Sequence, residues 1–147
     1  MKPQKVASGI LPIAESTKQI CLAWRSPEIR DGDRFGVIGG MVKDDLNLDE
    51  ADNAVIEMIE ETGYCGAIQL HPAFLYQRRG FRYHNFIGIV PEPFSFNPQP
   101  EFAFETSFLR WLPYQEALWL ASHWPKVMHQ GLVTLLFESR ELIERFT

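Results

Sequence analysis

The sequence predicts an α/β fold of the α+β kind, in which one mixed β-sheet is sandwiched between α-helices. Several short segments rich in β-branched and other apolar residues are separated by clusters of turn residues, which is typical of strands. One segment near the middle and one at the C-terminal end have the periodicity of amphipathic helices, and a proline opens a further short helix between them. The 147 residues suffice for a sizeable core, so we expect residues 1–147 to form a single domain.

The first third of the chain predicts three strands and two polar loops. Residues 5–14, KVASGILPIA, and 18–24, KQICLAW, are expected as strands joined by the turn ESTKQ. A polar loop follows at 25–34, and FGVIGG at 35–40 is expected as one short strand that ends in paired glycines. Residues 41–49, MVKDDLNLD, are expected as a second polar loop.

From about Asp49 to Thr62 the pattern changes to that of a helix. Asp49 is a suitable N-cap, and the acidic residues after it suit the positive end of the helix dipole. Apolar residues gather on one broad side of this helix, among them Ala51, Ala54, Val55, Met58 and Ile59. Gly63 stands where a glycine commonly ends a helix.

The second half of the chain predicts a strand hairpin, a loop, a further strand and two helices. Residues 66–78 and 81–90 are expected as strands around the turn RRG, and four prolines make 91–102 a loop. Residues 106–112 are expected as a strand and 113–121 as a short helix. Residues 125–146 are expected as one long amphipathic helix with a proline in its first turn.

Composition and charge exclude several classes of function. The chain is 46% hydrophobic and 22% charged, as is usual for a globular protein. No apolar run approaches the ~20 residues of a membrane helix, so we expect no membrane partner. A net charge of −5 argues against binding to extended nucleic acid. The N-terminus makes a poor signal peptide, and Cys21 and Cys65 suit buried free thiols, so we expect a cytoplasmic protein.

Glu57, Glu60 and Glu61 crowd into five consecutive positions of the predicted helix. Residues three and four apart lie close together on a helix, so their like charges repel. No lysine or arginine lies between Lys43 and Arg78 to offset them. Taken alone, such a cluster is more often a solvated acidic face. A divalent cation such as Mg²⁺, which prefers carboxylate oxygens, would supply the missing counter-charge.

The context of these glutamates resembles a known family signature. Residues 39–64, GGMVKDDLNLDEADNAVIEMIEETGY, are similar to the signature of the Nudix hydrolases, Gly-x5-Glu-x7-Arg-Glu-U-x-Glu-Glu-x-Gly-U, where U is a bulky apolar residue. Its second half matches at Glu57, Met58, Glu60, Glu61, Gly63 and Tyr64. FLRWLPYQEAL also resembles a strand–Trp–Pro–helix segment of these domains. The resemblance thus extends over nearly the whole chain and implies a Nudix-type fold.

The first half of the signature is altered. The family's arginine before the first metal-site glutamate is Ile56, and the early glutamate is Leu48. We expect these apolar side chains to pack on each other in place of the family's ion pair. Gly40 stands eight residues before Leu48, so the loop is two residues longer than in the signature. Nearby acidic residues that could replace the missing glutamate are Asp44, Asp45, Asp49 and, as first choice, Glu50.

The resemblance implies an enzyme that hydrolyses the phosphoanhydride of a nucleoside diphosphate linked to another moiety. It implies that Glu57, Glu60 and Glu61 bind Mg²⁺ or Mn²⁺ and form the catalytic centre. Glu105 is the first candidate for the general base and Glu101 the second, although each also suits a plain loop carboxylate. The alternative function is a Nudix-fold nucleotide-binding or regulatory domain without turnover. An unrelated domain with an acidic helix is a more remote alternative.

Substrate contacts are expected around the turn at 78–80 and beside the glycine pair. Arginines bind phosphate with a planar fork, and aromatic rings can stack on a base. The expected substrate-binding residues are Arg78, Arg79, Arg82, Tyr83, Arg34, Gly39 and Gly40. A positively charged hairpin tip is the alternative for the first four. The expected partner is a small nucleotide derivative; the sequence leaves open which one, and also whether the protein forms a homodimer.

Overall fold

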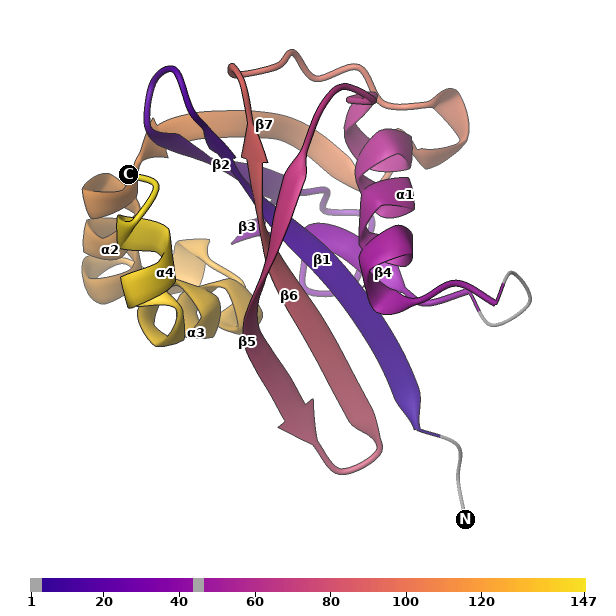
Figure 1. The fold of residues 1–147 in the computed structure, drawn as a ribbon. Coiled ribbons are helices and arrows are strands. Elements are labelled where there is room, and N and C mark those ends of the chain that lie inside the picture. Colours follow the sequence, from indigo (N-terminus) through magenta and orange to yellow (C-terminus); the bar gives the residue numbers. More distant parts are fainter. Residues whose placement is uncertain (1–3, 44–46) are drawn as a thin grey trace.

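A computed structural model describes residues 4–43 and 47–147 (Figure 1). Its seven-stranded sheet consists of β1 (Lys5–Ala14), β2 (Gln19–Arg25), β3 (Phe35–Gly36), β4 (Ile38–Met41), β5 (Gln69–Arg78), β6 (Phe81–Val90) and β7 (Thr106–Pro113). The strand order is β3-β2-β1-β6-β5, and in addition β4 pairs with β1 and β7 with β2. β1 and β6 run parallel, whereas the other pairs of these strands are antiparallel. The expected mixed sheet is therefore confirmed.

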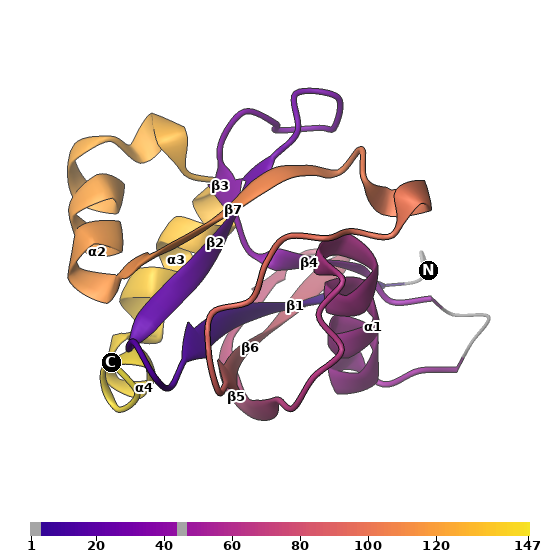
Figure 2. The same ribbon diagram turned by 90° about the horizontal axis from the view of Figure 1, so that it is seen from above.

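Helices cover both faces of the sheet. The described residues form α1 (Glu50–Thr62), α2 (Tyr114–His123), α3 (Gln130–Glu138) and α4 (Arg140–Glu144), with short 3-10 turns η2 (Pro100–Phe102) and η3 (Pro125–Val127). Figures 1 and 2 show α1 on one face and α2, α3 and α4 together on the other. None of the helices in the described ranges has the length and apolar character needed to cross a membrane.

Each face of the sheet buries its own apolar cluster. Under α1, Ala54 and Met58 pack with Ile10 and Ile38 of the strands. On the opposite face, the core is larger and includes Leu132, Leu135 and Leu136 of α3. Part of the apolar side that the sequence predicts thus packs on β1 and β4, and the buried side of α1 extends beyond it to Glu57 and Glu61.

Helix α1 begins and ends as its sequence predicts. The Asp49 side chain accepts a hydrogen bond of 2.7 Å from the backbone N–H of Asp52, which caps the first turn. Gly63 adopts a φ of 80°, and its N–H donates to the carbonyl of Ile59. A side chain at Gly63 would also collide with the carbonyl oxygen of Asn97, so both the backbone angle and the close approach require glycine.

The predicted single strand at 35–40 is wrong, because the structure divides it in two. Phe35 and Gly36 pair with β2, whereas Ile38 to Met41 pair with β1. The chain therefore changes partner strands at Val37. The second strand carries Gly39 and Gly40 alongside Gly9 and Ser8 of β1, and this pairing brings the glycine pair under α1.

The predicted long helix at 125–146 is also wrong. Met128 is extended, with φ −126° and ψ 138°, and forms a bridge with Phe35. The next residue, His129, donates its backbone N–H to the carbonyl of Phe35 and caps α3 by accepting a hydrogen bond from Gly131. Pairing with the sheet thus overrides helical periodicity, and the segment becomes η3, α3 and α4.

The two cysteines differ in exposure. Cys21 on β2 is fully buried, as the sequence predicts, and burial raises the pKa of its thiol. Cys65, however, is exposed, so its expected burial is wrong. Its neighbours Tyr64 and Ile68 pack against the apolar cluster under α1, whereas Cys65 is not part of that cluster.

Candidate functional site

Helix α1 directs Glu57 and Glu61 toward the sheet. They lie one turn apart, and their residues are only 7% and 6% exposed. A Cβ atom on Gly40 would lie 2.7 Å from the carboxyl carbon of Glu57. The carboxylate of Glu57 therefore lies directly on the β4 backbone, in space that only a glycine leaves free. This is a structural reason for a glycine at the position that the sequence singles out.

Glu105 joins these two carboxylates from the other side. It lies just before β7, and its backbone carbonyl accepts a hydrogen bond of 3.0 Å from the N–H of Ser26. Ligand oxygens of Glu57, Glu61 and Glu105 all lie within 4.8 Å of one another. The general-base candidate of the sequence is therefore part of the same carboxylate cluster as two of the three predicted metal ligands. We call Glu57, Glu61 and Glu105 the carboxylate cluster.

The carboxylate cluster is unfavourable without a counter-charge. Burial, with the charge of Glu60 in addition, raises the pKa of Glu57 to about 7. Burial and the charge of Glu105 raise the pKa of Glu61 well above its usual range. Burial and Glu60 likewise raise the pKa of Glu105. In the described part of the chain, Glu61 Oε2 is buried and has no hydrogen-bond partner. Carboxylate oxygens are the ligands that Mg²⁺ and Mn²⁺ prefer, so the donor set fits a divalent cation.

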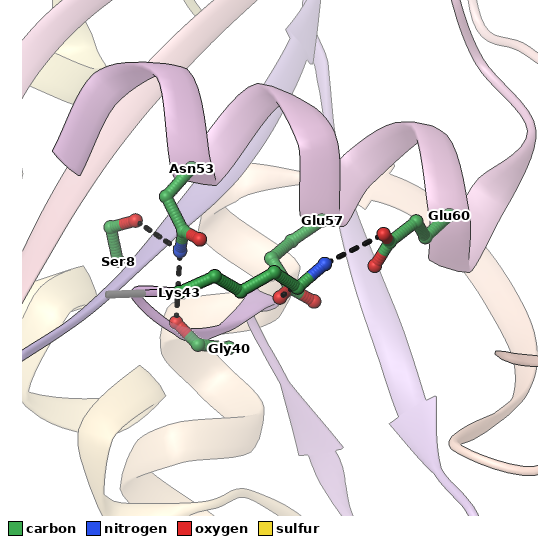
Figure 3. Close-up of polar contacts among 6 residues, drawn as sticks. All are labelled: Ser8, Gly40, Lys43, Asn53, Glu57 and Glu60. Carbon is green, nitrogen blue, oxygen red and sulfur yellow. Dashed lines mark hydrogen bonds and ion pairs between the residues drawn. The ribbon is translucent and has the colours of Figure 1, made fainter. Parts of the chain in front are cut away.

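Glu60, the third predicted metal ligand, forms an ion pair with a lysine instead (Figure 3). Lys43 Nζ is 2.7 Å from Glu60 Oε1 and 4.0 Å from Glu57 Oε1. The other oxygen of Glu60 is buried and has no hydrogen-bond partner among the described residues. The assignment of Glu60 as a metal ligand therefore stays a prediction. Sequence reasoning missed Lys43 because a loop lysine fourteen positions before Glu57 has no fixed geometry relative to the helix.

Asn53 forms a second contact between α1 and the glycine pair that sequence reasoning missed. Its side-chain N–H groups donate to Ser8 Oγ at 3.0 Å and to the carbonyl of Gly40 at 3.2 Å (Figure 3). Asn53 and Ser8 are both fully buried. The only sequence signal is that Asn53 stands one turn before Glu57 and so shares its side of the helix. The contact fixes Gly40, and with it the surface on which Glu57 lies.

Arg34, an expected substrate contact, and the neighbouring Arg25 form mostly local hydrogen bonds. Arg25 donates to the backbone carbonyls of Asp31 and Arg30 at 3.0 and 2.6 Å, which closes the loop between β2 and β3. Arg34 donates to the carbonyl of Gly32 at 3.3 Å. The charge of Arg25 also partly offsets the raised pKa of Glu61. Of the two arginines, Arg25 is therefore the one whose charge acts on the carboxylate cluster.

The predicted substrate-binding residues of the hairpin fall into two groups. Arg78 and Arg79 are exposed at its tip, which projects from the body of the molecule in Figure 1. Arg78 lies over the rings of Tyr76 and Phe81, at 5.9 and 6.0 Å from their centroids. Tyr83 is farther along β6, and its hydroxyl lies where a side chain on Gly39 would stand.

Arg82 lies between these groups, and its Nε is buried with no hydrogen-bond partner in the described part of the chain. Glu101 is exposed on η2, away from the carboxylate cluster that Glu105 has joined. Together, these positions bring Tyr83 and the glycine pair near the cluster, and leave Arg78 and Arg79 at the end of the hairpin.

The residues expected to replace the arginine and the early glutamate of the signature have the following positions. Leu48 and Ile56 are both half-buried, and their mutual packing stays a prediction. Glu50 lies with its Oε1 3.6 Å from His84 Nε2, so it faces β6. Asp49 is used as the helix cap. Asp44 and Asp45 lie outside the described residues.

Comparisons with known proteins agree with this geometry. A family model described as the NUDIX domain matches residues 3–132. A search of curated proteins found no match. Among solved structures, the Nudix hydrolase RenU from M. smegmatis is similar with a TM-score of 0.77 and 17% identity, over 100% of this chain and 90% of that one.

Two further neighbours were solved with, or are named for, nucleotide derivatives. The NUDIX domain of Shewanella oneidensis NrtR, complexed with ADP ribose, has a TM-score of 0.73 and 14% identity over 97% of this chain and 90% of that one. A C. elegans Ap4A hydrolase has a TM-score of 0.67 and 15% identity over 97% and 99%. At these identities the likeness concerns the fold.

Proposed function

Because this chain belongs to the NUDIX domain family, and is thereby a pyrophosphohydrolase, we propose that it cleaves nucleoside diphosphates linked to another moiety with a divalent cation as cofactor. The observation that supports this proposal is the carboxylate cluster. Three carboxylates with raised pKa values, held within 4.8 Å of one another, form a donor set that a hard cation satisfies and that folding alone leaves repulsive.

Glu57, Glu61 and Glu105 would hold the cation, and Glu60 would join them once it leaves Lys43. A bound Mg²⁺ or Mn²⁺ would polarise the diphosphate and lower the pKa of a water molecule, which would ease its deprotonation. The protein contributes the fixed positions of the carboxylates. Gly40 lets Glu57 lie against β4, and Ser26 holds the backbone of Glu105.

We assign Glu105 as the residue that accepts the proton of the attacking water. It reaches the carboxylate cluster from a loop, whereas Glu57 and Glu61 are fixed on one helix. One oxygen of its carboxylate would hold the cation, and the other would accept the proton. The attack of the activated water on one phosphorus breaks the phosphoanhydride bond and releases two phosphorylated products.

For the substrate, we propose a nucleotide derivative of the size of ADP-ribose or a dinucleoside polyphosphate. Two structural neighbours are described with such compounds, and this supports the class without selecting a member. Arg34, Arg82 and Tyr83, with Gly39, are the residues we expect to contact the nucleotide near the carboxylate cluster. Arg78 and Arg79 can contact it only if the substrate extends toward the hairpin tip.

We also propose that the chain acts as one domain in the cytoplasm. In support, the NUDIX match covers most of its length, and both cysteines are free thiols, as is usual in a reducing compartment. The sequence leaves a monomer and a homodimer open, and analytical ultracentrifugation of the purified protein decides between them.

The test is release of phosphate or nucleotide from a panel of compounds, with and without Mg²⁺. The panel contains ADP-ribose, nucleoside triphosphates, dinucleoside polyphosphates, sugar nucleotides and capped RNA. We expect metal-dependent release from at least one class, and its loss in Glu61→Gln. Unchanged turnover in Glu60→Gln would remove that residue from the ligand set.

Absence of release with retained nucleotide binding would favour the second candidate, a binding domain without turnover. One observation supports that alternative: the charged pair of the family's signature is replaced by Leu48 and Ile56.

A further inference from the structure

Lys43 connects the loop after β4 to the acidic side of α1. Its ammonium group lies 2.7 Å from Glu60 Oε1 and 4.0 Å from Glu57 Oε1. Figure 3 shows the side chain directed toward the Glu60 carboxylate. The same group lies 5.8 Å from the centroid of the Phe102 ring on η2. The side chain is 33% exposed, whereas that of Glu60 is 14% exposed. Lys43 thus points inward from the protein surface, toward the place where the carboxylates gather.

This contact supplies positive charge where the carboxylates need it. Glu57 belongs to the carboxylate cluster, and Glu60 lies one turn of the helix from it. Lys43 compensates one charge among these closely spaced glutamates, whereas a divalent cation would compensate two. A cation on Glu57 would also lie close to the ammonium group of Lys43 and repel it, because both contact the same carboxylate group.

The same contact attaches the loop to the helix. Leu48 and Ile56 are apolar and cannot form an ion pair between loop and helix. The ion pairs of Lys43 with Glu57 and Glu60, together with the hydrogen bond from Asn53 to the carbonyl of Gly40, join the β4 segment to α1. A partly buried ion pair of this kind contributes more than an exposed one, because solvent screens it less.

We propose that Lys43 is the internal counter-ion of Glu57 and Glu60 in the cation-free protein, and that it competes with the divalent cation for these carboxylates. This inference rests on the proposed function, because it concerns the same cation. Lys43 is a positioning residue: it holds Glu60 away from the carboxylate cluster, and a cation that binds there displaces it. The competition sets the cation concentration at which Glu60 becomes available as a ligand.

The test is a titration of the substrate-free protein with Mn²⁺. The electron paramagnetic resonance signal of free Mn²⁺ reports how much of the ion is bound. Lys43→Met keeps the aliphatic stem of the side chain and removes its charge. We expect it to bind Mn²⁺ about tenfold more tightly, because an ammonium group no longer repels the cation. Lys43→Arg keeps the charge and should bind close to wild type. Lys126→Met is the matched control, since Lys126 is an exposed lysine on η3.

Thermal unfolding in EDTA provides a readout that is independent of cation binding. Without its counter-ion, Lys43→Met should unfold about 3 °C below wild type in EDTA. In a separate measurement without EDTA, added Mn²⁺ should raise its Tm more than that of wild type. The direction of the affinity change separates the two roles of the residue. A lysine that only braces the loop would, on removal, loosen the site and weaken Mn²⁺ binding.

Equal or weaker Mn²⁺ binding in Lys43→Met, with wild-type protein binding normally, overturns the inference and leaves the proposed function intact. Absence of Mn²⁺ binding in both proteins instead contradicts the proposed function, and the inference with it. Tighter binding in Lys43→Met but not in Lys43→Arg or Lys126→Met supports the competition between lysine and cation.

Discussion

Gly40→Ala tests whether the glycine at this position leaves the space that the Glu57 carboxylate needs. The added Cβ atom would lie 2.7 Å from the carboxyl carbon of Glu57 and 2.8 Å from both of its oxygens. Gly40 does not adopt a positive φ, so alanine is compatible with its backbone. The whole effect of the substitution therefore falls on the carboxylate of Glu57, which is the mobile end of a flexible side chain.

The required displacement is large compared with the tolerance of a metal site. Ordinary carbon contacts begin near 3.4 Å, so the carboxylate must move by at least about 0.7 Å. Metal–ligand distances are held to within about 0.2 Å, and a misplacement of about 1 Å can reduce a rate about 100-fold. We therefore expect Gly40→Ala to weaken Mn²⁺ binding about tenfold and to reduce kcat by about 10- to 100-fold, with little loss of stability.

Gly39→Ala provides the contrast for these measurements. A Cβ atom there would collide with the backbone carbonyl of Ser8 and lie 2.6 Å from the Cα of Gly9, and backbone atoms in a sheet cannot yield as a side chain can. This variant should lose about 3 kcal/mol of the free energy of unfolding in urea. The reasoning is refuted if Gly40→Ala retains wild-type Mn²⁺ affinity and turnover, or if Gly39→Ala is as stable as wild type.

Three further predictions concern charge, hydrogen bonding and the cation. Because the pKa of Glu57 is raised to about 7 from a usual 4.5, the folded protein keeps a proton there that the unfolded chain has lost. The stability of the cation-free protein should therefore fall as pH rises from about 4.5 to 7, and thermal unfolding of Glu57→Gln should show a smaller slope, whereas an identical slope would contradict the raised pKa. Asn53→Ala removes one buried and one partly buried hydrogen bond and should lower the free energy of unfolding by about 1–3 kcal/mol in urea; no loss would show that the contact with Ser8 and Gly40 is dispensable. Added Mg²⁺ should raise Tm more at pH 8 than at pH 5, since the cation binds deprotonated carboxylates, and Glu61→Gln should abolish the rise at both pH values.

The elements that the sequence predicts well are those with local signals. Helix α1 has an acidic cap at Asp49, an apolar side and a terminal glycine, and all three act within a few residues of one another. The break at Met128 could not be predicted in this way, because it depends on pairing with Phe35, a residue far away in the sequence. The partner change at Val37 has the same origin, since it depends on which strand lies beside the chain.

The candidate site shows the same division. Glu57 and Glu61 could be recognised from their spacing on one helix, and Glu105 could be proposed only as one of two loop carboxylates. The folded chain brings Glu105 in through the hydrogen bond of its carbonyl with Ser26, a long-range contact without a sequence pattern. The contact of Lys43 with Glu60 could not be predicted for the same reason. The sequence suggested that the glutamates lack a nearby cation, whereas the fold brings one to them from the loop.

The central claim is that Glu57, Glu61 and Glu105 hold the divalent cation that drives hydrolysis. Anomalous X-ray diffraction from crystals grown with Mn²⁺ tests it most directly, because the signal locates the ion without reference to activity. The account predicts an anomalous peak about 2.0–2.3 Å from oxygens of these three carboxylates. A peak elsewhere, or none at a Mn²⁺ concentration that supports turnover, would contradict it.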